Sequence, residues 1–265
     1  PNPISAAGHA QLVETQNGDW WATFLATRPY EGDKYIIGRE TFLLPVTWRD
    51  GWPHILERGR TIPFTHARPN LAAGTPAVLP TSGDFAYADE FDGPKLGIQW
   101  IGIRTPTRPF HRLSGGALEL TPGAPLGDLK GVPAYLARRQ QHHIATVSTT
   151  VRFQPAKDGA RAGLAAVQSD RSHLFFGVTR IAGKPVVALY TRDMADTDTL
   201  VASAPVAVGG PVTLTIRANA GRWSFDYQAG GQKRTLKSDL DATLLTTERA
   251  GGFVGTTVGP YAYTP

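Results

Sequence analysis

The run Gly38-Arg39-Glu40-Thr41 contains Arg39, a residue well suited to binding a polar ligand. A guanidinium presents its N–H donors as a planar fork, so it can bind hydroxyls in pairs and keep nearby carboxylates ionised. The competing interpretation is a surface ion pair with Glu40. Neighbouring residues on a strand point to opposite faces, which disfavours that pair. Gly38 would allow the backbone to approach a ligand closely.

His9, directly after Gly8, is a second residue with useful chemistry. An imidazole can accept a hydrogen bond from water or bind a metal through one nitrogen while a neighbour fixes the other. On the residues alone, a buried histidine satisfied by the backbone is the favoured interpretation. A direct bond to Ca²⁺ is disfavoured because calcium prefers oxygen ligands, so a water-mediated link is the better metal hypothesis.

Two hairpins would position these residues. Gln11–Thr15 and Trp20–Ala26 flank an Asn17-Gly18 turn, and Glu40–Trp48 leads through a similar turn into Pro53–Leu56. Two hairpins cannot bury their own faces, so something else must cover them. The consecutive Trp20 and Trp21 must face opposite sides of their strand, which favours a packing role for both.

The second part of the chain shows short apolar runs every ten or so residues between turn signals, which is typical of a sandwich. The strands expected there are Ala117–Leu120, Tyr135–Arg139, Ile144–Phe153, Gly163–Gln168, Leu174–Arg180, Pro185–Tyr190, Val212–Ala218, Arg222–Tyr227 and Gly252–Val258. Helical periodicity is nearly absent. Residues 66–83, rich in Pro, Ala and Gly, lose all periodicity and are predicted to be a linker.

The composition suits a turn-rich all-β protein: 41% of the 265 residues are hydrophobic, and 29 are Gly and 21 Pro. The absence of cysteine excludes disulfides, thiolate metal sites and a cysteine nucleophile. The net charge of +5 comes from scattered arginines, which argues against nucleic acid as a partner. No apolar run is long enough to span a bilayer, so we expect a soluble protein without a membrane partner. Cytoplasm, periplasm and the cell exterior all stay open.

Several spaced positions in the first part carry a resemblance to a known family. They are Gly8-His9, the Trp20-Trp21 pair, Arg28-Pro29, the run from Gly38 to Thr41, and Val46-x-Trp48-x-Asp50-Gly51-Trp52-Pro53. This segment resembles the last blade of the five-bladed propeller of glycoside hydrolase family 43. The similarity is to the branch of β-xylosidases and α-L-arabinofuranosidases that carries a C-terminal β-sandwich.

Three stretches of the second part resemble that sandwich. They are Asp89–Asp92 followed by Trp100, Ala137–Gln140 with His142 close behind, and the closing Gly252-Phe253-x-Gly255-x-x-Val258-Gly259. The resemblance implies an all-β chain: the last propeller blade followed by a concanavalin-like antiparallel β-sandwich. The expected domains are 1–65 for the propeller portion, 66–83 for the linker and 84–265 for the sandwich.

The resemblance implies an inverting glycosidase that removes terminal xylose or arabinofuranose from xylo-oligosaccharides or arabinoxylan. In such enzymes the general base, the pKa-tuning aspartate and the general acid lie on earlier blades, so no catalytic residue is expected among the 22 acidic residues here. At 40 to 45 residues per blade, the four earlier blades would add on the order of 170 residues. An N-terminal propeller segment is therefore the expected partner, and a homo-oligomer stays open.

The resemblance also assigns roles to three residues. Arg39 matches a residue that reaches into the sugar pocket, and Phe253 is the nearest match to a phenylalanine that shortens it. His9 matches a histidine near the propeller axis that holds a water or a bound cation, so a Ca²⁺ linked through water is an expectation, while no cofactor is required. The short loop Tyr30–Ile37 leaves the choice between xylose and arabinose open. The main alternative is a noncatalytic carbohydrate-binding sandwich, and a purely structural interface module is a third.

Overall fold

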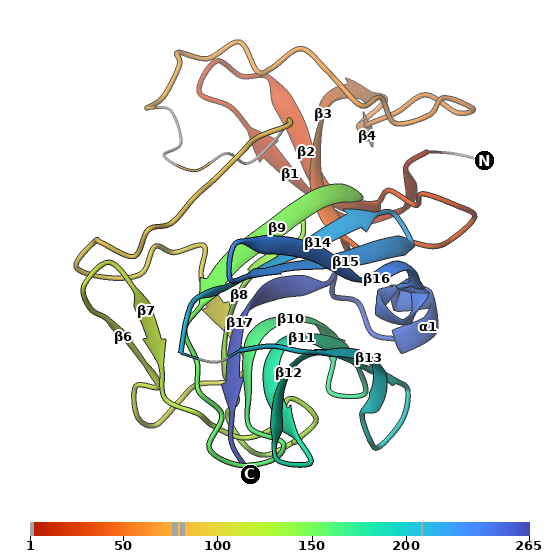
Figure 1. The fold of residues 1–265 in the computed structure, drawn as a ribbon. Helices are drawn as coiled ribbons and strands as arrows, with labels where there is room; N and C mark the ends of the chain where they lie inside the picture. Colours follow the sequence, from red (N-terminus) through yellow and green to blue (C-terminus); the bar gives the residue numbers. More distant parts are fainter. Residues whose placement is uncertain (1–2, 76–78, 80–82, 208) are drawn as a thin grey trace. The chain divides into compact units, whose positions relative to one another are not determined.

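A computed structural model describes residues 3–75, 79, 83–207 and 209–265. Nearly all regular structure is β-strand, as predicted; the exceptions are a 3-10 turn at Thr243–Leu245 and the short helix α1 (Thr247–Ala250) (Figure 1). Two compact units are present. The first contains Pro1–Pro29 and Arg39–Asp89, and the second contains Tyr30–Gly38 and Glu90–Pro265. None of the described helices is long and apolar enough to cross a membrane.

The first unit is a four-stranded antiparallel meander. Its strands are β1 (Ser5–Glu14), β2 (Trp20–Thr27), β3 (Glu40–Arg49) and β4 (Trp52–His54), in the order β1-β2-β3-β4. The turn before β2 has Gly18 at φ +86, and the turn before β4 has Asp50 and Gly51 at φ +50 and +78. Both predicted hairpins are thus present, because these residues tolerate the positive φ that tight hairpin turns require.

One face of this meander is packed and much of its remaining surface is open. Phe24, Leu44 and Val46 form a cluster with Ile4 and Ile62. Trp20 and Trp21 lie on opposite faces, as expected: Trp20 packs edge-on against Trp48, and Trp21 against His66. Other apolar side chains of the unit are exposed in this chain, namely Leu12, Val13, Leu43, Trp48, Trp52, Leu56, Phe64 and Tyr87.

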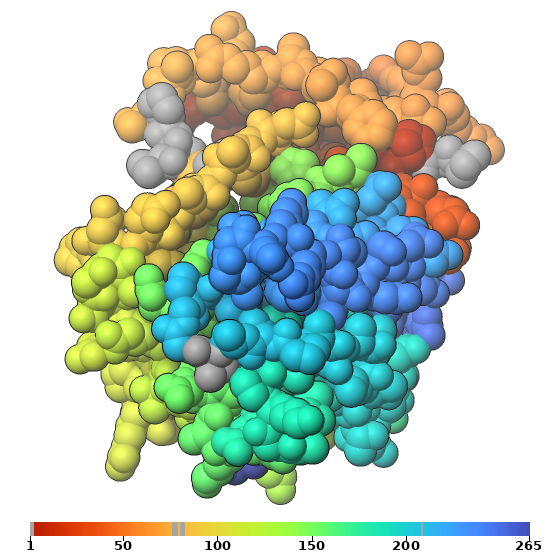
Figure 2. Space-filling view, viewed as in Figure 1, coloured from red at the N-terminus to blue at the C-terminus, as the bar shows by residue number. Residues whose placement is uncertain are grey.

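The second unit is a sandwich of two antiparallel sheets, β13-β12-β11-β10-β17-β8-β5 and β16-β15-β14-β9, with a separate β6-β7 hairpin. The strands are β5 (Ile101–Gly102), β6 (His111–Leu113), β7 (Leu118–Leu120), β8 (Ala134–Arg139), β9 (Ile144–Val151), β10 (Arg161–Ser169), β11 (Ser172–Ile181), β12 (Lys184–Asp193), β13 (Thr199–Pro205), β14 (Val212–Asn219), β15 (Arg222–Ala229), β16 (Gln232–Asp241) and β17 (Thr257–Tyr263). Figure 1 shows the sheets stacked, and Figure 2 gives the same view with all atoms as spheres.

Period-two alternation assigns side chains to the two faces of the larger sheet. Leu174, Phe176 and Val178 of β11 enter the core between the sheets, where they meet Trp223 and Phe225 of β15. The alternate residues point to the outer face. There Ala165, Phe175 and Tyr261 form a second cluster with Leu126 and Tyr135. The larger sheet is therefore packed on both sides.

The expected strand Gly252–Val258 is wrong by five residues, since the last strand begins at Thr257. Gly251 and Gly252 adopt φ +76 and +73 after α1, which breaks the extended conformation. The Thr256 N–H donates to the Ile36 carbonyl at 2.8 Å instead of joining the sheet before β17. Strands β13 and β16 were not predicted, because their polar, small-residue composition gives little hydrophobic signal.

The connection between β2 and β3 belongs to the second unit. Ile36 is fully buried in the inter-sheet core. The Tyr35 and Ile36 carbonyls accept backbone hydrogen bonds from Thr247 and Thr256, at 3.3 and 2.8 Å. A Cβ built on Gly38 would lie 2.3 Å from the Gly255 nitrogen, so the two backbones touch where only glycine fits. Tyr30–Gly38 is therefore an integral part of the sandwich unit.

A buried ion cluster ties together the outer-face strands. Asp198, between β12 and β13, accepts hydrogen bonds from Arg161 Nη1 at 2.5 Å and Arg192 Nε at 2.8 Å. His173 Nε2 of β11 lies 3.4 Å from the same carboxylate. Burial alone would raise the pKa of Asp198, but hydrogen bonds from His173 and Arg161 and their charges outweigh it and hold that pKa well below its usual range.

Substituting Gly38→Ala should destabilise the chain more than Gly231→Ala. Gly38 has φ +75 and Gly231 has φ +78, so an alanine at either position carries about 1–2 kcal/mol of left-handed backbone strain. Only Gly38 faces another backbone, whereas Gly231 has open space. The overpacking should add about 1–3 kcal/mol, measured by denaturant unfolding. Equal losses for the two variants would show that the close approach to Gly255 is unimportant.

Substituting Asp198→Asn should lower the free energy of unfolding by about 2–4 kcal/mol near pH 7, because two largely buried arginines lose their carboxylate. The depressed pKa means that this stabilisation is present above the unfolded-state pKa of about 3.9 and is lost as pH falls below it. Unfolding midpoints from pH 7 to pH 3 should therefore fall less steeply in the variant. Asp196→Asn, in the same loop with 91% of its side chain exposed, is the control and should change little.

Candidate functional site

Arg39 lies at the point where the chain returns from the second unit to the first, one residue before β3 begins. It is exposed in this chain. The Glu40 carboxylate accepts two hydrogen bonds from Arg28, Nε to Oε2 at 2.7 Å and Nη2 to Oε1 at 2.8 Å. These hydrogen bonds raise the pKa of Arg28. Because Arg28 bonds both carboxylate oxygens of Glu40, a surface ion pair between Arg39 and Glu40 is disfavoured.

Phe253 lies on the segment between α1 and β17, with 68% of its surface exposed. It is in none of the hydrophobic clusters formed by the described residues, so it is not part of the sandwich core. Gln168 Nε2 donates to the Gly251 carbonyl at 2.8 Å, and Thr247 Oγ1 donates to the Val254 carbonyl at 3.1 Å. The segment is thus anchored on both sides of Phe253, while most of the Phe253 surface stays exposed.

The Phe253 segment and the chain leading to Arg39 are fixed against each other within the second unit. A Cβ on Gly255 would lie 2.4 Å from the Ile37 carbonyl group, and a Cβ on Gly38 would meet Gly255. Gly38 precedes Arg39 directly, and Gly255 follows Phe253 by two residues. The sequence did not reveal this arrangement. The apolar run Ile36-Ile37 before Gly38 is the signal that could have indicated a buried connection.

Tyr30 begins the same connection and anchors its first half. Its ring packs edge-on against His143 with centroids 5.3 Å apart, and a Cβ at Gly221 would lie 2.7 Å from its hydroxyl. Burial is the main reason that the pKa of Tyr30 is raised to about 12, with nearby carboxylates adding to it. The connection is therefore held near both ends, at Tyr30 and at Gly38.

His9 lies on β1 with φ +56, between Gly8 and Gln11, where the pairing of β1 with β2 shifts register. Such a bulge re-aims the side chain, and bulges are frequent beside functional sites. His9 is exposed in this chain, so the buried-histidine interpretation does not apply to it. Within the described ranges no three His, Asp or Glu side chains gather as metal ligands. These residues alone do not fit a calcium site, and the water-linked Ca²⁺ stays a prediction.

Two family profiles match the chain. The profile described as glycosyl hydrolases family 43 matches residues 1–53, and the beta xylosidase C-terminal concanavalin A-like domain matches residues 88–265. Arg39 and His9 fall within the first match and Phe253 within the second.

Two named relatives align with nearly the whole of this chain. The non-reducing end alpha-L-arabinofuranosidase BoGH43B of Bacteroides ovatus is 33% identical over 98% of this chain and 48% of its own length. A xylosidase/arabinosidase of Butyrivibrio fibrisolvens is 29% identical over 98% of this chain and 49% of its own.

Solved structures also superpose on nearly the whole of this chain. The Bacteroides ovatus xyloglucan-locus GH43B structure superposes with a TM-score of 0.87 at 31% identity, over 99% of this chain and 51% of that one. The xylan beta-1,4-xylosidase of Bacillus halodurans C-125 gives 0.82 at 28% identity, over 98% and 51%. This chain spans about half the length of these relatives. It belongs to glycoside hydrolase family 43, within the group that carries a C-terminal concanavalin A-like domain.

Proposed function

We propose that this chain is the C-terminal portion of an inverting glycosidase that releases terminal xylose or arabinofuranose from xylo-oligosaccharides or arabinoxylan. The names of its relatives, an arabinofuranosidase, a xylosidase/arabinosidase and a xylosidase, support this substrate class. The observation that carries the proposal is the backbone contact between Gly38 and Gly255 within the second unit, because it holds the segment that bears Phe253 against the connection that ends at Gly38.

The carboxylates that perform the chemistry belong, in this proposal, to a preceding N-terminal part of the same enzyme. An inverting glycosidase needs one carboxylic acid to protonate the leaving oxygen and one carboxylate to activate water on the opposite face of the sugar. The exposed apolar surface of the first unit supports such a partner, since Trp52 is 74% exposed and Val13 48% exposed in this chain. Neighbouring blades would cover these side chains.

Arg39 then binds sugar hydroxyls and helps to keep the neighbouring carboxylates ionised. Phe253 presents an apolar ring that limits the pocket to one or two sugar residues. Because Gln168, Thr247 and the Gly38 backbone hold its segment, little ordering is left for substrate binding. We also propose that His9 holds an axial water, through which a cation would be linked.

Hydrolysis should require the complete enzyme. The chain joined to its preceding blades should release p-nitrophenol from the xyloside or the arabinofuranoside, and the chain alone should release none. A complete, folded enzyme that cleaves neither sugar would overturn the proposal.

Arg39→Ala should lower kcat/KM by about 100-fold, the loss expected for a charged donor pair in contact with the transition state. Arg60→Ala, an exposed arginine of the same unit, is the matched control and should stay within about twofold.

Phe253→Ala should lower kcat/KM by about tenfold through lost apolar contact, whereas Phe64→Ala, similarly exposed at 64%, should not. Parallel losses in each variant and its control would contradict these assignments.

A further inference from the structure

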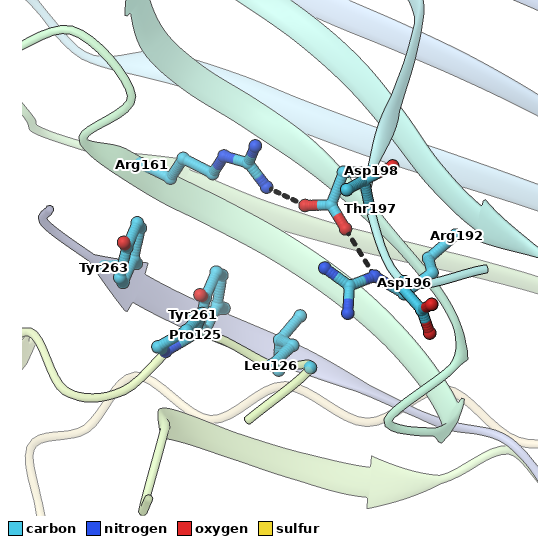
Figure 3. Close-up of a pocket in the computed structure, with 10 residues that line it drawn as sticks. Pro125, Leu126, Arg161, Arg192, Asp196, Thr197, Asp198, Tyr261 and Tyr263 are labelled. Atoms are coloured by element: carbon cyan, nitrogen blue, oxygen red, sulfur yellow. Dashed lines mark hydrogen bonds and ion pairs between the residues drawn. The ribbon is translucent and has the colours of Figure 1, made fainter. Parts of the chain in front are cut away.

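A half-open hollow of about 290 Å³ lies on the outer face of the larger sandwich sheet (Figure 3). The strand register brings its residues together, because Arg161 on β10 is directly opposite Tyr263 on β17, and Gly163 is opposite Tyr261. Alternate residues share a face, so Arg161, Tyr261 and Tyr263 all project outward. Nothing in the proposed hydrolytic function uses this hollow.

One wall is a fixed row of hydrogen-bonding groups. Asp198 lies between Arg161 and Arg192, as Figure 3 shows, and bonds one nitrogen of each. The Arg161 guanidinium carbon also lies 4.1 Å from the Tyr190 ring centroid, which holds the guanidinium by a cation–π contact. Buried Arg161 Nε has no hydrogen-bond acceptor among the described residues. The row therefore presents donors from two arginines beside an acceptor carboxylate.

The opposite wall is apolar and aromatic, formed by Pro125, Leu126, Tyr261 and Tyr263 (Figure 3). Burial raises the pKa of Tyr261, so its phenol stays neutral at physiological pH. A sugar ring has the same two-sided character, with C–H groups that pack on aromatic faces and hydroxyls that need donors and acceptors together.

We propose that this hollow, whose lining includes neither Arg39 nor Phe253, binds a ring of a neutral saccharide. A neutral ligand suits the lining better than an anion, since Asp198 bonds both arginines and Asp196, which is paired with Arg171, adds a second carboxylate. An anionic group would meet two carboxylates, whereas a hydroxyl can donate to Asp198 and accept from an arginine.

The neighbouring surface favours an oligosaccharide over a single sugar. A second hollow of about 310 Å³ shares Leu126 with the first and is lined by Gln168 and Val254. Gln168 Oε1 is buried without a donor among the described residues, although Nε2 of the same amide is used. A chain of sugars that fills both hollows would supply that donor.

Gly127→Ala tests the proposal without deleting a charge. A Cβ at this position would lie 1.8 Å from Arg192 Nη1, so the guanidinium must move out of the row. Gly93→Ala is the matched control, because its Cβ would make only an ordinary contact at 3.7 Å. Binding is measured by retention of the protein in gels that contain soluble arabinoxylan, and by calorimetry with xylohexaose, xylose and glucuronate. The choice of xylan probes rests on the proposed function, but retention does not require hydrolysis.

The apparent Kd for xylohexaose should rise about tenfold in Gly127→Ala and stay unchanged in Gly93→Ala, which corresponds to the loss of one or two hydrogen bonds. Xylose should bind more weakly than xylohexaose. Tyr263→Leu removes the ring on which the sugar would stack, so it should also weaken binding of xylohexaose. This variant replaces Gly127→Ala in the test if Gly127→Ala lowers the melting temperature. Unchanged binding in both folded variants, loss of binding in Arg39→Ala, or binding of glucuronate alone would each overturn the proposal.

Discussion

The burial of Ile36 in the sandwich core is the constraint on which the candidate hydrolytic site depends. Ile36 comes from the connection between two strands of the meander, yet it is fully buried among side chains of both sandwich sheets. Burying an isoleucine contributes about 1.5–3 kcal/mol, and the backbone hydrogen bonds from Thr247 and Thr256 add to it. The connection therefore cannot move without opening the core of the second unit.

The burial of Ile36 restricts the segment that carries Phe253 through contacts between backbones rather than through flexible side chains. Ile36 fixes Ile37 and Gly38, Gly38 touches Gly255, and Gly255 fixes the segment that carries Phe253. Gln168 on β10 holds the other side of that segment. Contacts between backbones leave little freedom, which suits the pocket-limiting role proposed for Phe253.

On the outer face of the larger sheet, an ion cluster lies beside the apolar cluster that contains Phe175 and Tyr261. Asp198 collects hydrogen bonds or ion pairs from three strands, and its depressed pKa reflects how strongly the folded state favours the carboxylate. The same arrangement that stabilises the loop after β12 leaves arginine donors facing the hollow. One ion cluster can in this way serve both stability and ligand binding.

The sequence alone determined the all-β class, the two hairpins, most sandwich strands and the family, because period-two alternation, turn residues and spaced motifs are local signals. The resemblance also singled out Arg39 and Phe253, whose pocket roles stay predictions; both side chains are exposed in this chain. Tertiary structure decided that residues 30–38 belong to the sandwich, that the last strand starts at Thr257, and that Asp198 joins Arg161 and Arg192. These features depend on contacts between residues that are distant in the chain, and local sequence patterns do not specify such contacts.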